Sequence, residues 1–218
     1  MHHKKTYLLL FIMVALAGLF FTVQVRRLRQ ITVTRSSVGL ISEKSSFIPI
    51  SATDPIFGNP GAPITVVEFM DFNCEKCFTF HTTIKEFVNS HPQDIRLVWK
   101  DLPQDKIFSR NVSRIHENGW CIAQQDQKKF WQFIESVQQN PHLSESALQT
   151  LLIGLNINTD QLSTCLNSGA AKQKLAESAG IFQNLGLKTP PIIFVNNKLI
   201  NTQEDINLAD MLETFIKK

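Results

Sequence analysis

The sequence predicts an α/β domain that carries an all-helical insertion and follows an N-terminal membrane-spanning helix. Two apolar runs rich in β-branched residues, 64–72 and 95–100, enclose a helical pattern, and a third run at 192–195 precedes a short strand at 198–200. Residues from about 106 to 187 have helical periodicity throughout. A strand–helix–strand opening that ends in a hairpin and a helix is typical of α/β domains, so the central helices are expected as an insertion.

The predicted helices have apolar faces. The helix from Cys74 to about Ser90 buries one side, and Pro92 prevents its continuation. A closing amphipathic helix is expected over 204–218. Large aromatic residues in the insertion are expected in its core, with a peptide-binding surface as the alternative. They are Trp120, Phe130, Trp131 and Phe133.

Length and composition fit one globular domain with an appendage, because the chain has 218 residues of which 43% are hydrophobic. The net charge of +3 comes from the start of the chain. Residues 1–50 hold seven of the 22 Lys and Arg but one of the 19 acids, which leaves 15 basic and 18 acidic residues in the rest. The folded part therefore lacks the electrostatic footprint of a nucleic-acid-binding protein.

Residues 1–29 are predicted to be a signal anchor. An apolar stretch from Tyr7 to Val25 would be about 28 Å long as a helix, near the hydrocarbon thickness of a bilayer. A cleavable signal is the alternative, because Ala15 and Ala17 are small residues at suitable spacing. The arginines that follow the stretch favour a cytoplasmic domain by the positive-inside rule. The cysteines favour an oxidising compartment, and we expect the domain on the extracytoplasmic side.

The remainder divides into a linker at 30–53 and a folded domain at 54–218. The linker has Ser, Thr and isolated aliphatic residues without a sustained period, and prolines and glycines between 55 and 63 mark the entry to the first strong strand.

Cys74-Glu75-Lys76-Cys77 stands where the first apolar run gives way to the helical pattern. Unpaired backbone N–H groups and the positive end of the helix dipole favour a thiolate at Cys74. Lys76 adds to this effect and Glu75 subtracts from it, so their net contribution stays open. Cys77 lies one turn further on the apolar face and is expected to be the shielded resolving thiol. The pair is predicted to carry out thiol–disulfide exchange.

A zinc site is the alternative for a CxxC motif, and it needs two further ligands. Cys121 and Cys165 are isolated in the sequence and no histidine pair has zinc-finger spacing, so we expect no metal. His81 is expected at a surface position of its helix, and His116 has no partner pattern.

Together these residues resemble the DsbA-like thiol:disulfide oxidoreductases, which have a thioredoxin fold. The resemblance extends from Phe57 to the C-terminus and rests on six segments in family order. They are 57–77, 95–103, Cys121-Ile-Ala-Gln, Phe130-Trp131, Cys165-Leu166 and Lys188-Thr-Pro-Pro-Ile-Ile-Phe-Val-Asn-Asn197. The chain departs from the family at Glu75-Lys76, where similar proteins have Pro-His or Pro-Tyr, and at Lys188 and Asn197, where they often have Gly.

Glu68 is the next candidate, because it is an acid within an otherwise apolar strand, six residues before Cys74. Burial of an acid is costly unless the group is used. The resemblance implies that it relays the proton of the buried cysteine, and a solvated strand face is the alternative.

The resemblance also implies a cis-proline beside the sulfurs, which leaves neighbouring backbone groups free to bind an extended substrate. By the match of Thr189-Pro190, the cis bond is expected before Pro190, with Pro191 as the alternative. It further implies a structural disulfide between Cys121 and Cys165, for which two free thiols are the alternative.

The function that follows from the resemblance is a membrane-tethered oxidoreductase that forms disulfides in reduced, exported polypeptides. The disulfide of Cys74 and Cys77 is its redox group, without metal or organic cofactor, and a quinone-linked membrane partner reoxidises it. A reductase or isomerase would use the same residues, and a noncatalytic anchored binding module is a third hypothesis.

Overall fold

The computed structural model of the protein describes residues 20–22, 41–104, 110–140, 143–202 and 207–217. The chain divides into two compact units, Met1–Ile41 and Ser42–Lys218. Apart from residues 20–22, which are helical, the predicted anchor at 1–29 lies outside the described residues. Among the residues that are described, no helix has the length and apolar character needed to cross a bilayer.

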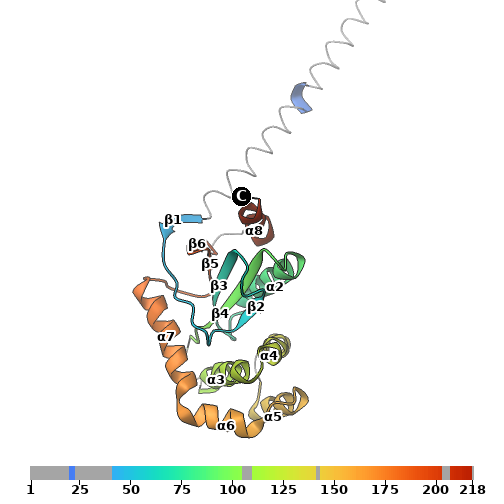
Figure 1. The fold of residues 1–218 in the computed structure, drawn as a ribbon, viewed down its shortest axis with the longest axis vertical. Coiled ribbons are helices and arrows are strands. Elements are labelled where there is room, and N and C mark those ends of the chain that lie inside the picture. Colours follow the sequence, from blue (N-terminus) through green and yellow to red (C-terminus); the bar gives the residue numbers. More distant parts are fainter. Residues whose placement is uncertain (1–19, 23–40, 105–109, 141–142, 203–206, 218) are drawn as a thin grey trace, which may run out of the picture. The chain divides into compact units, whose positions relative to one another are not determined.

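A six-stranded sheet forms the centre of the second unit (Figure 1), with the strand order β1-β6-β5-β3-β4-β2. The strands are β1 (Ile41–Ser45), β2 (Ile56–Gly58), β3 (Ile64–Met70), β4 (Ile95–Asp101), β5 (Ile192–Val195) and β6 (Lys198–Ile200). The central strands β3 and β4 are parallel, and β5 runs antiparallel to β3. The four strands predicted from the sequence are β3 to β6, which confirms the α/β class.

The predicted linker at 30–53 is wrong for its second half. Residues 41–45 form β1, and the Ile48 side chain is 2% exposed in the main hydrophobic core. Asn197 fixes this segment, because its carbonyl accepts the N–H of Ser46 and its side chain accepts the N–H of Ile48. Short edge strands such as β1 and β2 give little periodic signal, which is why the sequence did not indicate them.

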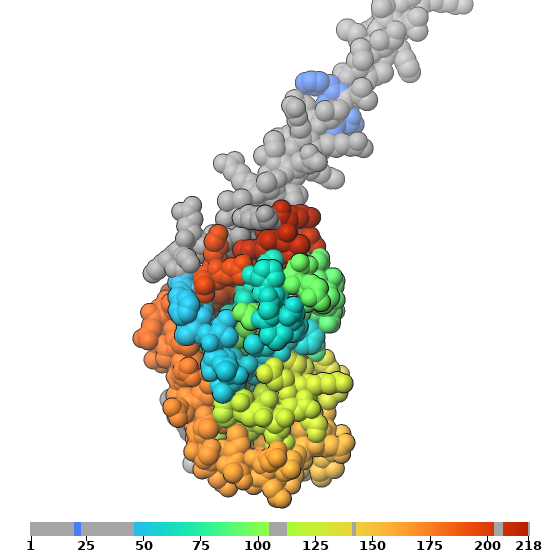
Figure 2. All heavy atoms as spheres, in the orientation of Figure 1, coloured from blue at the N-terminus to red at the C-terminus, as the bar shows by residue number. Residues whose placement is uncertain are grey.

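Seven helices complete the described part of the second unit. They are α2 (Glu75–Ser90), α3 (Arg110–Gln125), α4 (Gln127–Gln139), α5 (Glu145–Gly154), α6 (Thr159–Ser168), α7 (Ala170–Asn184) and α8 (Leu208–Ile216). Helices α3 to α7 form the predicted insertion, drawn yellow-green to orange in Figure 2. Its aromatic residues are buried as expected, and Trp131 and Phe130 pack against Trp99 of the sheet.

The two faces of the sheet are covered by different helices. Val67 and Phe69 of β3 belong to the core that contains Phe182 of α7. Successive side chains of a strand point to opposite faces, so Glu68 between them points away from α7. It meets His81 of α2 on the other side. Strand alternation therefore places the one acid of β3 under the helix that follows the CxxC motif.

Candidate active site

The CxxC motif lies at the junction of β3 and α2. Cys74 is the N-cap residue of α2 and is joined to Cys77 by a disulfide. The backbone N–H of Cys77 donates a hydrogen bond to Cys74 Sγ over 3.1 Å. Cys74 is half-buried, whereas Cys77 is fully buried. One sulfur is therefore accessible and receives an amide hydrogen bond, and the core shields the other.

Asp71 organises the loop that leads from β3 to Cys74. Its backbone carbonyl accepts the N–H of Cys74 over 3.1 Å, and its Oδ1 accepts the N–H of Asn73 over 2.9 Å. Its Oδ2 accepts the N–H of Gln104 over 3.0 Å. The aspartate thus fixes the backbone that delivers Cys74 to the helix end.

The dipeptide between the cysteines is exposed. The ammonium group of Lys76 lies 5.8 Å from the centre of the Phe80 ring, one turn further along α2. Its charge therefore lies near an aromatic ring of the next helical turn.

Glu68 is fully buried, and its Oε1 lies 2.7 Å from Nδ1 of His81. His81 is 2% exposed, so the predicted surface position is wrong. Four residues along a helix lie on the same face, and His81 therefore shares the buried face of Cys77. Its ring stacks on Trp131 at 5.9 Å between centroids. Glu68 Oε2 and His81 Nε2 are buried and have no hydrogen-bond partner within the described residues.

His116 of α3 also reaches the site, which its sequence context did not indicate. It is fully buried, and its Nδ1 lies 2.7 Å from Asp101 Oδ1, at the end of β4. Its Nε2 accepts the backbone N–H of Phe72 over 3.3 Å and lies 3.6 Å from Asp71 Oδ1. A histidine of the insertion therefore contacts the loop that precedes Cys74.

Two groups of this cluster have shifted proton affinities. Burial opposes a charge on His116, but hydrogen bonds and attraction from Asp101 and Asp71 outweigh it and raise the pKa of the imidazole above 6.5. Burial likewise opposes ionisation of Asp71. The interaction with the neighbouring His116 imidazole and hydrogen bonds from the N–H groups of Asn73 and Gln104 outweigh it and hold the pKa of the Asp71 carboxyl below 3.8.

The cis bond was expected before Pro190, and this prediction is wrong by one residue. The alternative, Pro191, is the cis-proline. The cis peptide joins Pro190 to Pro191, and Pro191 is the buried residue directly before β5. Thr189 is exposed and Pro190 is half-buried. The match of Thr-Pro led to the wrong proline, whereas the apolar run that begins at Ile192 marks Pro191 as the residue at the strand.

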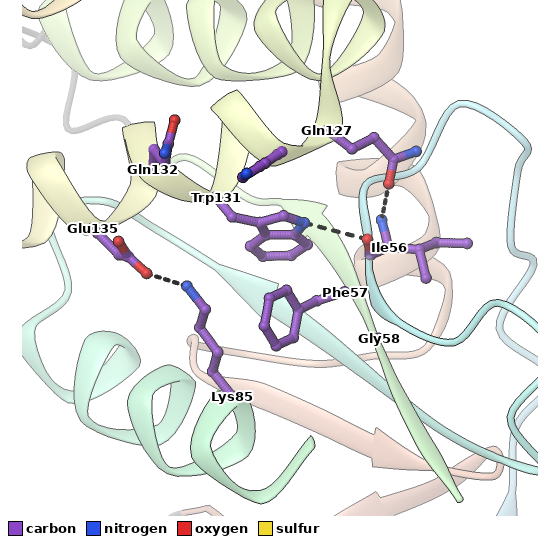
Figure 3. A pocket seen from close by; sticks show the side chains of 9 residues that line it. Ile56, Phe57, Gly58, Lys85, Gln127, Trp131, Gln132 and Glu135 are labelled. Carbon is purple, nitrogen blue, oxygen red and sulfur yellow. Dashed lines mark hydrogen bonds and ion pairs between the residues drawn. The ribbon is translucent and has the colours of Figure 1, made fainter. Parts of the chain in front are cut away.

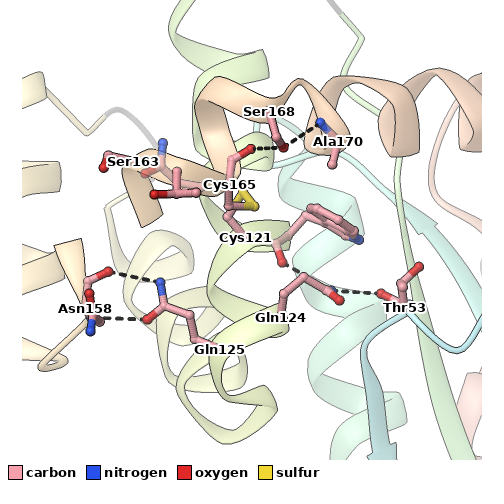
Figure 4. The surroundings of a disulfide bond; sticks show 12 residues. Thr53, Cys121, Gln124, Gln125, Asn158, Ser163, Cys165, Ser168 and Ala170 are labelled. Carbon is pink, nitrogen blue, oxygen red and sulfur yellow. Dashed lines mark hydrogen bonds between the residues drawn. A yellow bond between two sulfur atoms is a disulfide. The ribbon is translucent and has the colours of Figure 1, made fainter. Parts of the chain in front are cut away.

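Cys121 and Cys165 are joined by a second disulfide, between α3 and α6 (Figure 4). Cys121 is fully buried and Cys165 is half-buried. The bond ties together two helices of the insertion. With both pairs formed, none of the four cysteines of the chain is free.

A metal site and a surface hollow were also considered as candidate sites. In the part of the chain that the structure describes, no three His, Cys, Asp or Glu side chains form a group that could hold a metal ion. A surface hollow of about 470 Å³ lies between β2, α2 and α4 (Figure 3). Its Trp131 indole donates to the carbonyl of Ile56, and Lys85 pairs with Glu135. None of the predicted site residues lines it.

Comparison with known proteins identifies the family. The family model described as Thioredoxin matches residues 51–218. Disulfide bond formation protein D of Bacillus subtilis is 24% identical over 176 residues, which cover 75% of this chain and 76% of that protein.

Solved structures show the same fold. The oxidised form of BdbD from Bacillus subtilis has a TM-score of 0.64 at 20% identity, covering 81% of this chain and 97% of that one. The thiol-disulfide exchange protein alpha-DsbA2 from Wolbachia pipientis has a TM-score of 0.64 at 17% identity, covering 77% and 87%.

The predicted resemblance is thereby confirmed, including the thioredoxin fold with its helical insertion. The chain belongs to the thioredoxin family and is a DsbA-like thiol:disulfide oxidoreductase, with the Cys74–Cys77 disulfide as its redox group.

Proposed function

We propose that this protein is a membrane-tethered oxidant that forms disulfides in reduced, exported polypeptides. The observation that carries the proposal is the hydrogen bond from the Cys77 N–H to Cys74 Sγ at the N-terminus of α2. An amide donor and the helix dipole stabilise a thiolate more than a disulfide sulfur. They therefore favour the reduced state of the pair and make the disulfide a good oxidant.

The reaction consists of two exchanges at Cys74. A substrate thiolate attacks Cys74 Sγ, the Cys74–Cys77 bond breaks, and Cys77 leaves as a thiolate that takes up a proton. A second substrate thiolate then attacks the substrate sulfur of the mixed disulfide and expels Cys74 as a thiolate. The substrate loses two electrons and two protons, of which Cys77 keeps one and solvent takes the other, and the enzyme is left with a Cys74 thiolate and a Cys77 thiol.

Glu68 is proposed to supply and accept the proton of Cys77. It is buried on the face of the sheet that α2 covers, and it pairs with a side chain one turn after Cys77. A buried carboxyl with one unpartnered oxygen is suited to proton exchange in a site without bulk water. The exposed Thr189 and the neighbouring Pro190 are proposed to border the substrate groove.

The extracytoplasmic location is proposed from the cysteines and from the relatives. Two disulfides in one domain suit an oxidising compartment. A relative is named for disulfide bond formation. Residues 1–29 would hold the domain at the membrane, and a quinone-linked membrane partner would reoxidise the dithiol.

Thiol trapping of the full-length protein in its native cells tests the direction of the reaction. A Cys74–Cys77 pair that is mainly oxidised at steady state supports an oxidant, and the Cys121–Cys165 disulfide serves as the internal oxidised reference. A mainly reduced pair would instead indicate a reductase or isomerase. A reduction potential above about −180 mV supports the oxidant, and one near −270 mV contradicts it.

A further inference from the structure

His116 connects the helical insertion to the backbone of the CxxC loop. It lies on α3, yet each ring nitrogen contacts another element: Nδ1 meets Asp101 at the end of β4, and Nε2 meets the N–H of Phe72. Phe72 is two residues before Cys74, and its ring lies 4.3 Å from the imidazole between centroids. The imidazole is closed off from solvent.

These contacts define the protonation state of the ring. An ionised carboxylate only accepts hydrogen bonds, so Nδ1 must donate to Asp101 Oδ1. The same oxygen accepts the indole N–H of Trp99 over 2.8 Å. The N–H of Phe72 can donate to Nε2 only if that nitrogen has a free lone pair. The arrangement is therefore that of a neutral imidazole.

A second proton on His116 changes the hydrogen bonds of the loop. Protonated Nε2 is a donor, so it cannot accept from the N–H of Phe72. Asp71 Oδ1, at 3.6 Å, is the carboxylate oxygen within reach, and it already accepts the N–H of Asn73. Protonation thus exchanges a bond to the Phe72 backbone for a bond to the Asp71 side chain, next to the residues that place Cys74.

We propose that His116 is a proton-operated positioning residue, whose protonation favours the reduced state of the Cys74–Cys77 pair and makes the disulfide a stronger oxidant at lower pH. The proposal deepens the proposed function. The added positive charge lies beside the loop of Cys74 in a water-excluded site, where it favours the Cys74 thiolate over the uncharged disulfide.

The charges that face the imidazole allow it to titrate in the fold. Within the described residues they are Asp71 from the loop and Asp101 from β4, and both favour the protonated ring. On its own helix, Arg114 is turned to the surface, where it pairs with Glu145. The two carboxylates hold the pKa of His116 above its ordinary value against the effect of burial.

Linkage gives a test that requires no variant. If protonated His116 favours the dithiol, reduction of the pair must strengthen proton binding at His116 by the same factor. We expect the ring to titrate roughly half to one pH unit higher in the reduced full-length protein than in the oxidised protein, a three- to tenfold coupling. NMR titration of the His116 ring in both states measures it, and the Phe72 amide signal should follow the same curve. Equal titration in the two states would overturn the proposal.

Variants test the same coupling through the redox equilibrium with glutathione. The wild-type equilibrium constant should show an extra three- to tenfold change across the His116 titration, beyond that due to thiol ionisation. His116→Gln and His116→Asn should lose this change, whereas His91→Gln should keep it. His91 is a partly exposed histidine at the end of α2 that pairs with Glu213. Persistence of the change in both His116 variants would contradict the proposal.

These outcomes are separate from the proposed function. The linkage between His116 protonation and the redox state of Cys74–Cys77 is measured on the purified protein. It does not depend on the direction of the reaction in the cell. A mainly reduced pair in cells would remove the oxidant function and leave the linkage intact, and an absent linkage would leave the oxidant function intact.

Discussion

Glu68 Oε1 of β3 lies 2.7 Å from Nδ1 of His81, on the turn of α2 that follows Cys77. Both side chains are excluded from solvent, and each has a second polar atom without a partner in the described residues. This buried pair is the one that the proposed proton relay of Glu68 would use. His81 lies on the face of α2 that also buries Cys77.

Replacement of Glu68 tests its proton role. Glu68→Gln keeps the shape of the side chain and removes its proton exchange. We expect Cys77 to displace glutathione from a Cys74–glutathione mixed disulfide about 10- to 100-fold more slowly near neutral pH. Rapid-quench mass spectrometry measures that step. Glu135→Gln, an exposed acid on α4, is the matched control and should leave the rate unchanged. An unaltered rate in Glu68→Gln would rule out the relay.

The two active-site cysteines should differ sharply in reactivity. Cys74 is accessible and receives an amide hydrogen bond, whereas Cys77 is buried. In the reduced protein we expect iodoacetamide to alkylate Cys74 at least about 100-fold faster than Cys77 near pH 6. Peptide mass mapping over time measures both rates. Equal rates would mean that the helix end does not activate Cys74.

Loss of the second disulfide should affect stability rather than redox chemistry. Cys121 and Cys165 are 44 residues apart, so their bond closes a long loop in the unfolded chain. The double change Cys121→Ala and Cys165→Ala should cost about 3–4 kcal/mol in the free energy of unfolding. Denaturant titration measures this cost. The glutathione equilibrium of Cys74–Cys77 should stay at the wild-type value, and a large shift there would contradict a purely structural bond.

Stability should depend on pH at both ends of the range because of Asp71 and His116. The pKa of Asp71 is lowered in the fold, so its contribution is present above about 3.8 and is lost as the pH falls through the folded value. The pKa of His116 is raised, so its contribution is present below 6.5 and is lost as the pH rises through the folded value. Denaturant titration at a series of pH values measures this. The free energy of unfolding should fall less steeply at acid pH in Asp71→Asn, and less steeply at the upper end of the pH range in His116→Gln. A wild-type pH dependence of the free energy of unfolding in both variants would contradict these roles of Asp71 and His116.

The sequence predicted the central strands and the CxxC position well because their signals are local. Strands β3, β4 and β5 are continuous apolar runs, and the motif marks the start of α2 by itself. The hairpin also followed from sequence: Asn196 and Asn197 adopt φ of 47° and 65°, which Asn tolerates.

The histidines were missed because their partners come from other elements. His81 meets an acid on a strand, and His116 meets a loop 44 residues earlier in the chain. Periodicity reports which side of a helix is buried, not what lies opposite. The spacing of four between Cys77 and His81 was the one signal that could have placed His81 inside.

The attachment of Ser46 and Ile48 to Asn197 shortens the segment that could act as a free linker before the folded domain. With residues 1–29 as the proposed anchor, the chain between the anchor and β1 comprises residues 30–40. Eleven residues reach at most about 40 Å when fully extended, half of what a free segment through residue 53 would allow. Under that proposal, the start of the folded domain would stay within about 40 Å of the end of the anchor.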